Sequence, residues 1–263
     1  MQGAQPDYRD SVEQWRRQRE ARLRADDGWL TVAGLFWLKS GENRFGPGET
    51  YAISLPADVK ATGSFHLNDG EVTASVDGTA VRNQALQPDQ EAQAIQLGRI
   101  SMFVIKRGDR YAIRMRDQES QYRREFKGLT WYPVKPEYRA TAKFVLYNPP
   151  KTIAIPNIIG GAFPETCPGY AEFELRGKKL LLEPVLSEGR LFFIFRDQTS
   201  GKKTYGAGRF LYSDIAEDGT VTLDFNHAYT PPCAFTPYAT CPLPPKQNRL
   251  PVAIEAGELD YAH

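Results

Sequence analysis

Two cysteines and a histidine lie close together in the C-terminal part of the chain. Cys233 and Cys241 are eight residues apart, and His227 precedes Cys233 by six residues. A cysteine nucleophile needs a neighbouring base that forms the thiolate. His227 is a candidate for this base, with Asp224 or Glu255 as the carboxylate that orients it. This pattern makes Cys233 and Cys241 candidate catalytic residues of a cysteine-dependent hydrolase, although no thiol-hydrolase signature surrounds them.

Cysteine and histidine are also zinc ligands, but their spacing here does not favour a metal site. Common zinc motifs separate paired cysteines by roughly two to four residues, whereas Cys233 and Cys241 are further apart. A disulfide between them and a pair of inert buried thiols both remain open. We expect no cofactor, because the sequence contains no Gly-rich phosphate loop, dinucleotide fingerprint or Gly-x-Ser-x-Gly elbow.

A second group of polar residues lies in the long connection that runs from Arg196 to Arg209 between two apolar segments. Its structural interpretation is a hairpin loop with a solvated tip. Its functional interpretation is the mouth of a pocket, where the planar guanidinium of Arg209 suits an anion. Small-molecule sites combine apolar walls with a few convergent polar groups. The predicted ligand-binding residues are Arg196, Asp197, Tyr205, Arg209, Asn226, Tyr238, Asn248, Arg249 and Glu255.

The segment from Asp224 to Glu258 holds seven of the nineteen prolines in the chain. It is too irregular for a helix or a series of strands, yet too rich in aromatic and aliphatic residues for a solvated tail. Proline removes a backbone donor and stiffens the chain. We therefore predict that this Pro-rich segment packs against the preceding β-structure, first as a structural seal and second as the wall of a site.

The elements expected before this segment are one helix and many short strands. A helix is predicted from about Asp7 to Arg24, because Val12, Trp15, Arg19 and Leu23 share one face. We interpret it as a docked amphipathic arm, with a partner-binding helix as the alternative. Residues 29–38 form a dense apolar segment, and residues 41–46 are expected to form a turn. Strands are predicted over residues 51–55, 63–67, 71–76, 94–97, 100–107, 110–116, 138–147, 151–156, 170–175, 179–184, 190–196, 206–212 and 220–224.

This pattern predicts a mainly β protein in three segments. Residues 1–28 form an N-terminal helical arm, and residues 29–116 form a β-sandwich with the strand rhythm of a forkhead-associated domain. Residues 117–263 form a second β-sandwich or a barrel, closed by the Pro-rich segment. Ser64 and His66 are two residues apart, whereas phosphothreonine-binding forkhead-associated domains place them three apart, so phosphopeptide binding is not favoured.

Composition excludes several classes of partner. The 33 basic and 32 acidic residues are balanced, so nothing favours nucleic acid as a partner. No apolar run reaches the roughly 18 residues that a membrane span requires. No signal peptide is visible at the N-terminus, which leaves two expectations for location: cytoplasmic, or exported with the signal peptide absent from this chain. The oligomeric state stays open.

Five stretches together resemble the domain of unknown function 1684 (DUF1684) family. They are residues 27–39 (DGWLTVAGLFWLK), 126–133 (FKGLTWYP), 195–201 (FRDQTSG), 204–211 (TYGAGRFL) and 228–258 (AYTPPCAFTPYATCPLPPKQNRLPVAIEAGE). The resemblance extends over nearly the whole chain from Tyr8 onward. It implies a fold and a bacterial or archaeal setting, but no reaction, and it implies that some relatives carry export signals.

Three positions depart from the pattern that this resemblance implies. His227 stands where Lys or Arg is usual, Thr230 where Asn is usual, and Leu259 where Lys is usual. A catalytic residue shared by the family is therefore not expected at His227. The favoured function is small-molecule binding, or an enzyme acting on a small ligand, with a pocket in the C-terminal β unit. The alternatives are a protein-interaction module and the cysteine-dependent hydrolase.

Overall fold

The computed structural model describes residues 7–81 and 85–261, and most of its regular structure is β-strand. The chain divides into two compact units. One unit is Arg24–Phe126, and the other combines Met1–Leu23 with Lys127–His263. Within the described ranges, no helix is long and apolar enough to cross a membrane. The expected mainly β class is confirmed, and the three-segment division of the chain stays a prediction.

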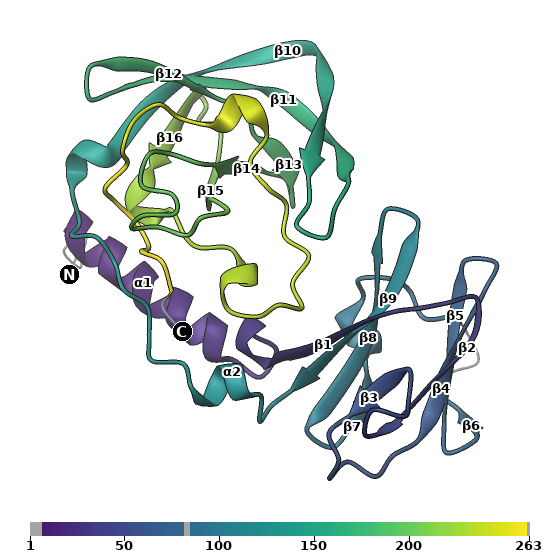
Figure 1. Ribbon diagram of the computed structural model, residues 1–263. Helices are drawn as coiled ribbons and strands as arrows, with labels where there is room; N and C mark the ends of the chain where they lie inside the picture. Colours follow the sequence, from purple (N-terminus) through teal and green to yellow (C-terminus); the bar gives the residue numbers. More distant parts are fainter. Residues whose placement is uncertain (1–6, 82–84, 262–263) are drawn as a thin grey trace, which may run out of the picture. The chain divides into compact units, whose positions relative to one another are not determined.

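Two sheets form the unit Arg24–Phe126 (Figure 1). The first has the strand order β3-β2-β4-β5-β6, and the second has the order β1-β9-β8-β7. The bounds are β1 (Val32–Trp37), β2 (Gly41–Pro47), β3 (Ile53–Leu55), β4 (Gly63–Asn68), β5 (Glu71–Val76), β6 (Thr79–Ala80), β7 (Ile95–Leu97), β8 (Ile100–Arg107) and β9 (Arg110–Asp117). Short helices η1 (Trp29–Thr31), η2 (Glu91–Gln93) and α2 (Gln121–Arg124) complete the unit.

The core of this unit is shared by both sheets. Phe45 and Phe65 of the first sheet belong to the same buried cluster as Met102 and Ile113 of the second. Two sheets that pack their apolar faces on one core form a β-sandwich. The turn predicted over residues 41–46 is wrong, because Phe45 is fully buried and strand β2 pairs with β4 on one side and β3 on the other.

The second unit contains helix α1 and two further sheets, with strand orders β12-β11-β10-β16 and β13-β14-β15. Its elements are α1 (Tyr8–Arg24), η3 (Pro136–Tyr138), β10 (Arg139–Pro156), β11 (Ala162–Leu175), β12 (Lys178–Leu182), β13 (Val185–Ser187), β14 (Arg190–Phe195), β15 (Arg209–Ser213), β16 (Thr220–Asp224), η4 (Phe225–His227), η5 (Pro232–Ala234) and η6 (Lys246–Asn248). Both strand orders are open, so neither sheet closes into a barrel within the described residues.

The end of the Pro-rich segment supplies part of the core of this unit. Leu250, Val252, Ile254 and Ala256 alternate along the chain and are buried in one cluster with side chains of β10, β11, β14 and β16. After β16 the chain passes through η5 and η6, and Glu258 then pairs with Arg19 of α1; Figure 1 shows this segment in green to yellow. The expected closure of the C-terminal β unit by this segment is confirmed.

Helix α1 docks on the same unit through polar contacts as well as apolar ones. Its face buries Val12 and Leu23, as the spacing predicts. The hydroxyl of Tyr8 donates to Asp224 at the end of β16. The guanidinium of Arg19 donates to the buried carboxylate of Glu258 at 3.2 Å. The first residue of the helix and a residue in its second half are therefore tied to segments more than 200 residues away in the chain.

Candidate functional site

A pocket of about 330 Å³ lies between helix α1 and the sheet that contains β14 and β15. It is lined by Trp15, Arg190, Leu211, Tyr212, Asp224, His227 and Tyr229. These residues come from α1, from β14 and β15, from the end of β16 and from the chain that follows it. The volume lies at the lower end of the range for small-molecule sites, which starts at roughly 300 Å³.

Asp224 and His227 are paired on one wall of this pocket. Nδ1 of His227 lies 3.2 Å from Oδ2 of Asp224. The pairing is local in origin, because Asp224 caps the short helix η4 and His227 is its last residue. The capping carboxylate accepts the backbone N–H of Asn226 at 3.1 Å, which fixes the turn. The turn therefore presents the imidazole beside the carboxylate.

Two further donors converge on the same carboxylate. Tyr8 donates its hydroxyl to both oxygens of Asp224, at 2.9 and 3.0 Å, and the amide of Asn226 donates to Oδ1 at 3.1 Å. Burial alone would raise the pKa of Asp224, but the hydrogen bonds from His227, Asn226 and Tyr8 outweigh it and lower the pKa. Asp224 is therefore an ionised anchor at neutral pH that holds the side chains around it.

Aromatic rings form the remaining walls. The ring of Trp15 meets the imidazole of His227 edge to face, with centroids 4.8 Å apart and planes at 90°. Tyr212 stacks on Phe192 with centroids 4.6 Å apart. The guanidinium of Arg190 lies 5.4 Å from the Tyr212 centroid, and it is bound to Asp214 by two hydrogen bonds of 2.9 Å. The pocket thus combines flat aromatic walls with the guanidinium of Arg190 and the Asp224–His227 pair.

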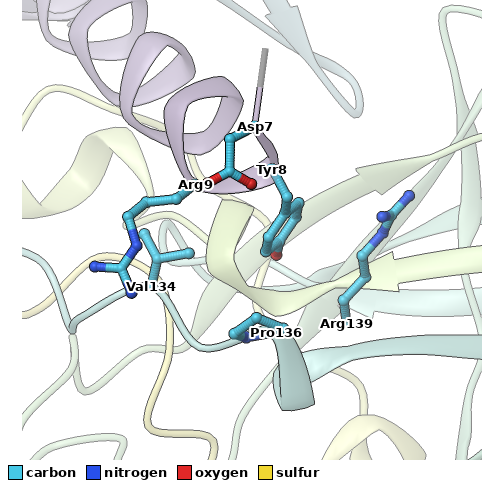
Figure 2. A pocket seen from close by; sticks show the side chains of 6 residues that line it. All are labelled: Asp7, Tyr8, Arg9, Val134, Pro136 and Arg139. Atoms are coloured by element: carbon cyan, nitrogen blue, oxygen red, sulfur yellow. The ribbon is translucent and has the colours of Figure 1, made fainter. Parts of the chain in front are cut away.

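A second pocket, of about 450 Å³, lies at the start of helix α1 and is lined by Asp7, Tyr8, Arg9, Val134, Pro136 and Arg139. Figure 2 shows Arg9 and Arg139 on opposite sides of Tyr8, with their guanidinium groups pointing away from each other. The hydroxyl of Tyr8 is already engaged with Asp224. Because the two cations do not converge, this pocket is the weaker candidate for an anion site.

Arg209 and Asp197 lie at a different place from both pockets. Their ion pair is 2.7 Å long, and both side chains are fully buried. Arg209 also donates to the backbone oxygens of Ile254, at 2.9 Å, and Ala256. Asp197 accepts the backbone N–H and the hydroxyl of Thr199. These contacts join strand β15, the loop after β14 and the C-terminal segment, so the pair supports the fold; its predicted ligand-binding role stays a prediction.

Asn248 has a similar bridging position. Its amide donates to the backbone oxygens of Glu183 and Ile194, at 2.7 and 3.0 Å, and accepts from the N–H of Glu183. The neighbouring backbones of Arg196 and Arg249 pair in parallel. These three predicted residues hold η6 against strand β14.

The other predicted residues are dispersed. Asn226 borders the 330 Å³ pocket through Asp224, and its amide also bonds the backbone of Lys135. Glu255 lies 3.9 Å from the amine of Lys135. The backbone N–H of Tyr238 donates to the hydroxyl of Thr236. None of the nine predicted ligand-binding residues lines either of the two pockets described above, and Asn226 contacts one of them through its hydrogen bond to Asp224.

The two candidate catalytic cysteines do come together. Cys167, Cys233 and Cys241 are present as thiols rather than as disulfides. The backbone N–H of Cys233 donates to the sulfur of Cys241 at 3.2 Å, and the hydroxyl of Tyr205 donates to the sulfur of Cys233 at 3.5 Å. His227, considered above as their base, pairs instead with Asp224. Within the described ranges, no group of three or more His, Cys, Asp or Glu side chains has the geometry of a metal site.

The sequence-based prediction did not include most of the pocket lining. Of the two carboxylates considered as partners of His227, Asp224 and Glu255, the structure pairs Asp224 with the imidazole. Trp15 was assigned only to the docked face of the helix, and Arg190 and Tyr212 only to strands. Their common location depends on the packing of α1 against β14 and β15, for which the sequence carries no local signal.

Comparisons with known proteins identify the family. The chain is similar to the solution NMR structure of the uncharacterized protein from gene locus rrnAC0354 of Haloarcula marismortui, with 31% sequence identity and a TM-score of 0.44. That match covers 52% of this chain and 78% of the other. No curated protein matches the chain. The family model described as "Protein of unknown function (DUF1684)" matches residues 124–259, more than half of the chain, which confirms the resemblance. The chain belongs to the DUF1684 family.

Proposed function

We propose that this protein binds a small anionic molecule with a planar apolar part in the pocket lined by Trp15, Arg190 and His227. The observation that carries the proposal is the combination of two cation-forming side chains with aromatic walls around a volume of about 330 Å³. This combination is typical of small-molecule sites, in which apolar walls supply affinity and a few polar groups supply orientation.

Arg190 is suited to receive the anionic group. Its side chain is 48% exposed, and the side chain of its partner Asp214 is 65% exposed. Exposed ion pairs contribute little to stability, at about 0–1 kcal/mol. A ligand carboxylate, sulfonate or phosphate can therefore replace Asp214 at low cost and accept the same two parallel N–H groups.

His227 supports the same kind of ligand. Its Nδ1 is held by Asp224, so the imidazole has a fixed orientation beside the pocket. The family resemblance implies Lys or Arg at this position in relatives, and these residues, like histidine, carry an N–H donor next to Asp224. An N–H donor beside the carboxylate is then the common property.

The aromatic residues favour a planar ligand. Trp15, Tyr212 and Tyr229 all line the pocket. Burial raises the pKa of Tyr229, so its ring stays neutral and does not repel an anion. Flat rings at several angles accommodate an aromatic or heterocyclic ring by edge-to-face and offset contacts.

A ligand panel tests this proposal. Benzoate, naphthalene-2-sulfonate and adenosine monophosphate are compared with the uncharged benzamide, by Trp fluorescence and by thermal stabilisation. At least one anion is expected to bind saturably. Arg190→Gln and His227→Gln are each expected to lower the affinity for that anion about tenfold. A tenfold loss corresponds to about 1.4 kcal/mol, roughly the contribution of one charged hydrogen bond.

Arg17→Gln is the matched control, because Arg17 is an exposed arginine of helix α1 in the same unit and does not line the pocket. It should leave the affinity unchanged. Equal weakening by Arg190→Gln and Arg17→Gln, or equal stabilisation by benzamide and benzoate, would contradict the proposal.

The Asp224–His227 pair also favours a second function, proton transfer on the bound ligand. A carboxylate that holds Nδ1 of a neutral imidazole leaves Nε2 as the acceptor that a general base requires. This function predicts that His227→Lys keeps ligand affinity but abolishes turnover. If His227→Lys keeps both ligand affinity and turnover, His227 contributes to binding but not to proton transfer.

A further inference from the structure

The two cysteines of the Pro-rich segment form a pair independent of the proposed ligand pocket. Cys233 lies in η5 and is half-buried, whereas Cys241 is 4% exposed. The N–H of Cys233 reaches the sulfur of Cys241 at 3.2 Å. Since N–Cα is about 1.5 Å, that sulfur lies within about 4.7 Å of the Cα of Cys233, a separation compatible with disulfide geometry.

The backbone around Cys241 is fixed by the neighbouring β-ribbon. Its carbonyl accepts the N–H of Ile158 at 3.0 Å, and the N–H of Leu243 donates to Pro156 at 2.7 Å. Pro232 precedes Cys233 and Pro242 follows Cys241, which limits backbone freedom at both ends. The two thiols are therefore held together by structure that does not depend on a bond between them.

The surroundings of Cys233 favour its thiolate. The hydroxyl of Tyr205 donates to its sulfur at 3.5 Å. A hydrogen bond from the Cys241 thiol is the largest influence on the pKa of Cys233 and lowers it, with a further contribution from Tyr205, against burial, which raises it. Cys167 provides the contrast, because burial raises its pKa to about 11. Thiolate character and access determine which cysteine reacts.

We propose that Cys233 and Cys241 are a hydroperoxide-sensitive thiol pair, in which Cys233 attacks the oxidant and Cys241 resolves the product. The geometry that carries this proposal is that the Cys241 sulfur and the Tyr205 hydroxyl both contact Cys233, which is half-buried.

The chemistry balances in two steps. The Cys233 thiolate attacks one oxygen of a hydroperoxide ROOH; the S–O bond forms, the O–O bond breaks, and the leaving alkoxide takes a proton to become ROH. The sulfur is oxidised to a sulfenic acid. The Cys241 thiol then attacks that sulfur, forming the S–S bond and releasing the hydroxyl group as water. A dithiol such as dithiothreitol reduces the resulting Cys233–Cys241 disulfide by thiol–disulfide exchange.

Peroxide titration followed by mass spectrometry tests the pair. Wild-type protein treated with hydrogen peroxide is expected to form the Cys233–Cys241 disulfide while Cys167 stays reduced. Cys241→Ser is expected to accumulate a sulfenic acid at Cys233 that dimedone traps. Tyr205→Phe should slow the oxidation several-fold, up to the tenfold that one pKa unit represents.

Cys167→Ser is the matched control and should oxidise like the wild type. Circular dichroism checks that each variant folds. If a variant does not fold, the comparison of Cys233 with Cys167 in the wild-type protein still tests the proposal. The proposal is overturned if Cys233 and Cys167 oxidise at equal rates in the wild-type protein. It is also overturned if dimedone labels Cys241 in Cys233→Ser but does not label Cys233 in Cys241→Ser.

Discussion

The guanidinium of Arg209 donates to the carboxylate of Asp197 at 2.7 Å, and neither side chain is exposed to solvent. Removing one partner of such a buried pair leaves the other charge without compensation. We predict that Arg209→Ala lowers the free energy of unfolding by about 3–5 kcal/mol. Urea denaturation measures this loss. Arg190→Ala, which breaks an exposed pair, should cost under about 1 kcal/mol; equal losses in the two variants would exclude the structural role of Arg209.

Docking of helix α1 depends on Arg19 and Glu258. Burial raises the pKa of Glu258, and Arg19 partly opposes this shift. Arg19→Ala should therefore destabilise the protein by about 3 kcal/mol, because it leaves a fully buried carboxylate unpaired. Adding Glu258→Gln should recover part of the loss, since the amide carries no charge. Arg17→Ala, at an exposed position of the same helix, serves as the control; no recovery in the double variant would show that packing, not charge, is what Arg19 provides.

Stability at acid pH should depend on Asp224. Its pKa is lower in the folded protein than in the unfolded chain, where it is about 3.9. Between these two pKa values the unfolded state therefore binds more protons than the folded state. The stability that Asp224 contributes is present above about pH 4 and is lost as the pH falls toward the pKa of Asp224 in the folded protein. Asp224→Asn should flatten the dependence of the melting temperature on pH in this window. Glu174→Gln, an exposed carboxylate on β11, should leave the slope as in the wild type.

Close packing of strands β10 and β11 requires glycine at position 169. A Cβ there would lie 2.3 Å from the backbone oxygen of Val145, so a strand has to move. Gly169→Ala should destabilise the protein by about 1–3 kcal/mol, the usual range for overpacking. Gly206→Ala is the matched control, because the nearest atom to its added Cβ is 3.7 Å away. Thermal unfolding compares the two, and a neutral Gly169→Ala would mean that the strands separate without strain.

Local backbone chemistry made much of the fold predictable. Asp77 and Gly78 adopt φ angles of 48° and 81°, the conformation that a tight hairpin turn requires and that an Asp-Gly pair favours, directly after the strand predicted over residues 71–76. The same reasoning was wrong at residues 41–46. Glycine at both ends of that stretch suggested a turn, but burial of Phe45 between two neighbouring strands makes it strand β2.

The sequence by itself therefore determined the mainly β class, most strands, the docked helix and the closing role of the Pro-rich segment, because these depend on periodicity and turn residues within a few positions. It also gave Asp224 as one of two carboxylates that could orient His227, and these two residues share one turn. Only the tertiary structure decided that Trp15, 212 residues before His227, packs against its ring, and that Arg209 is buried in an ion pair with Asp197. Contacts between distant segments depend on how apolar faces pack, and no local preference specifies which polar side chains that packing encloses.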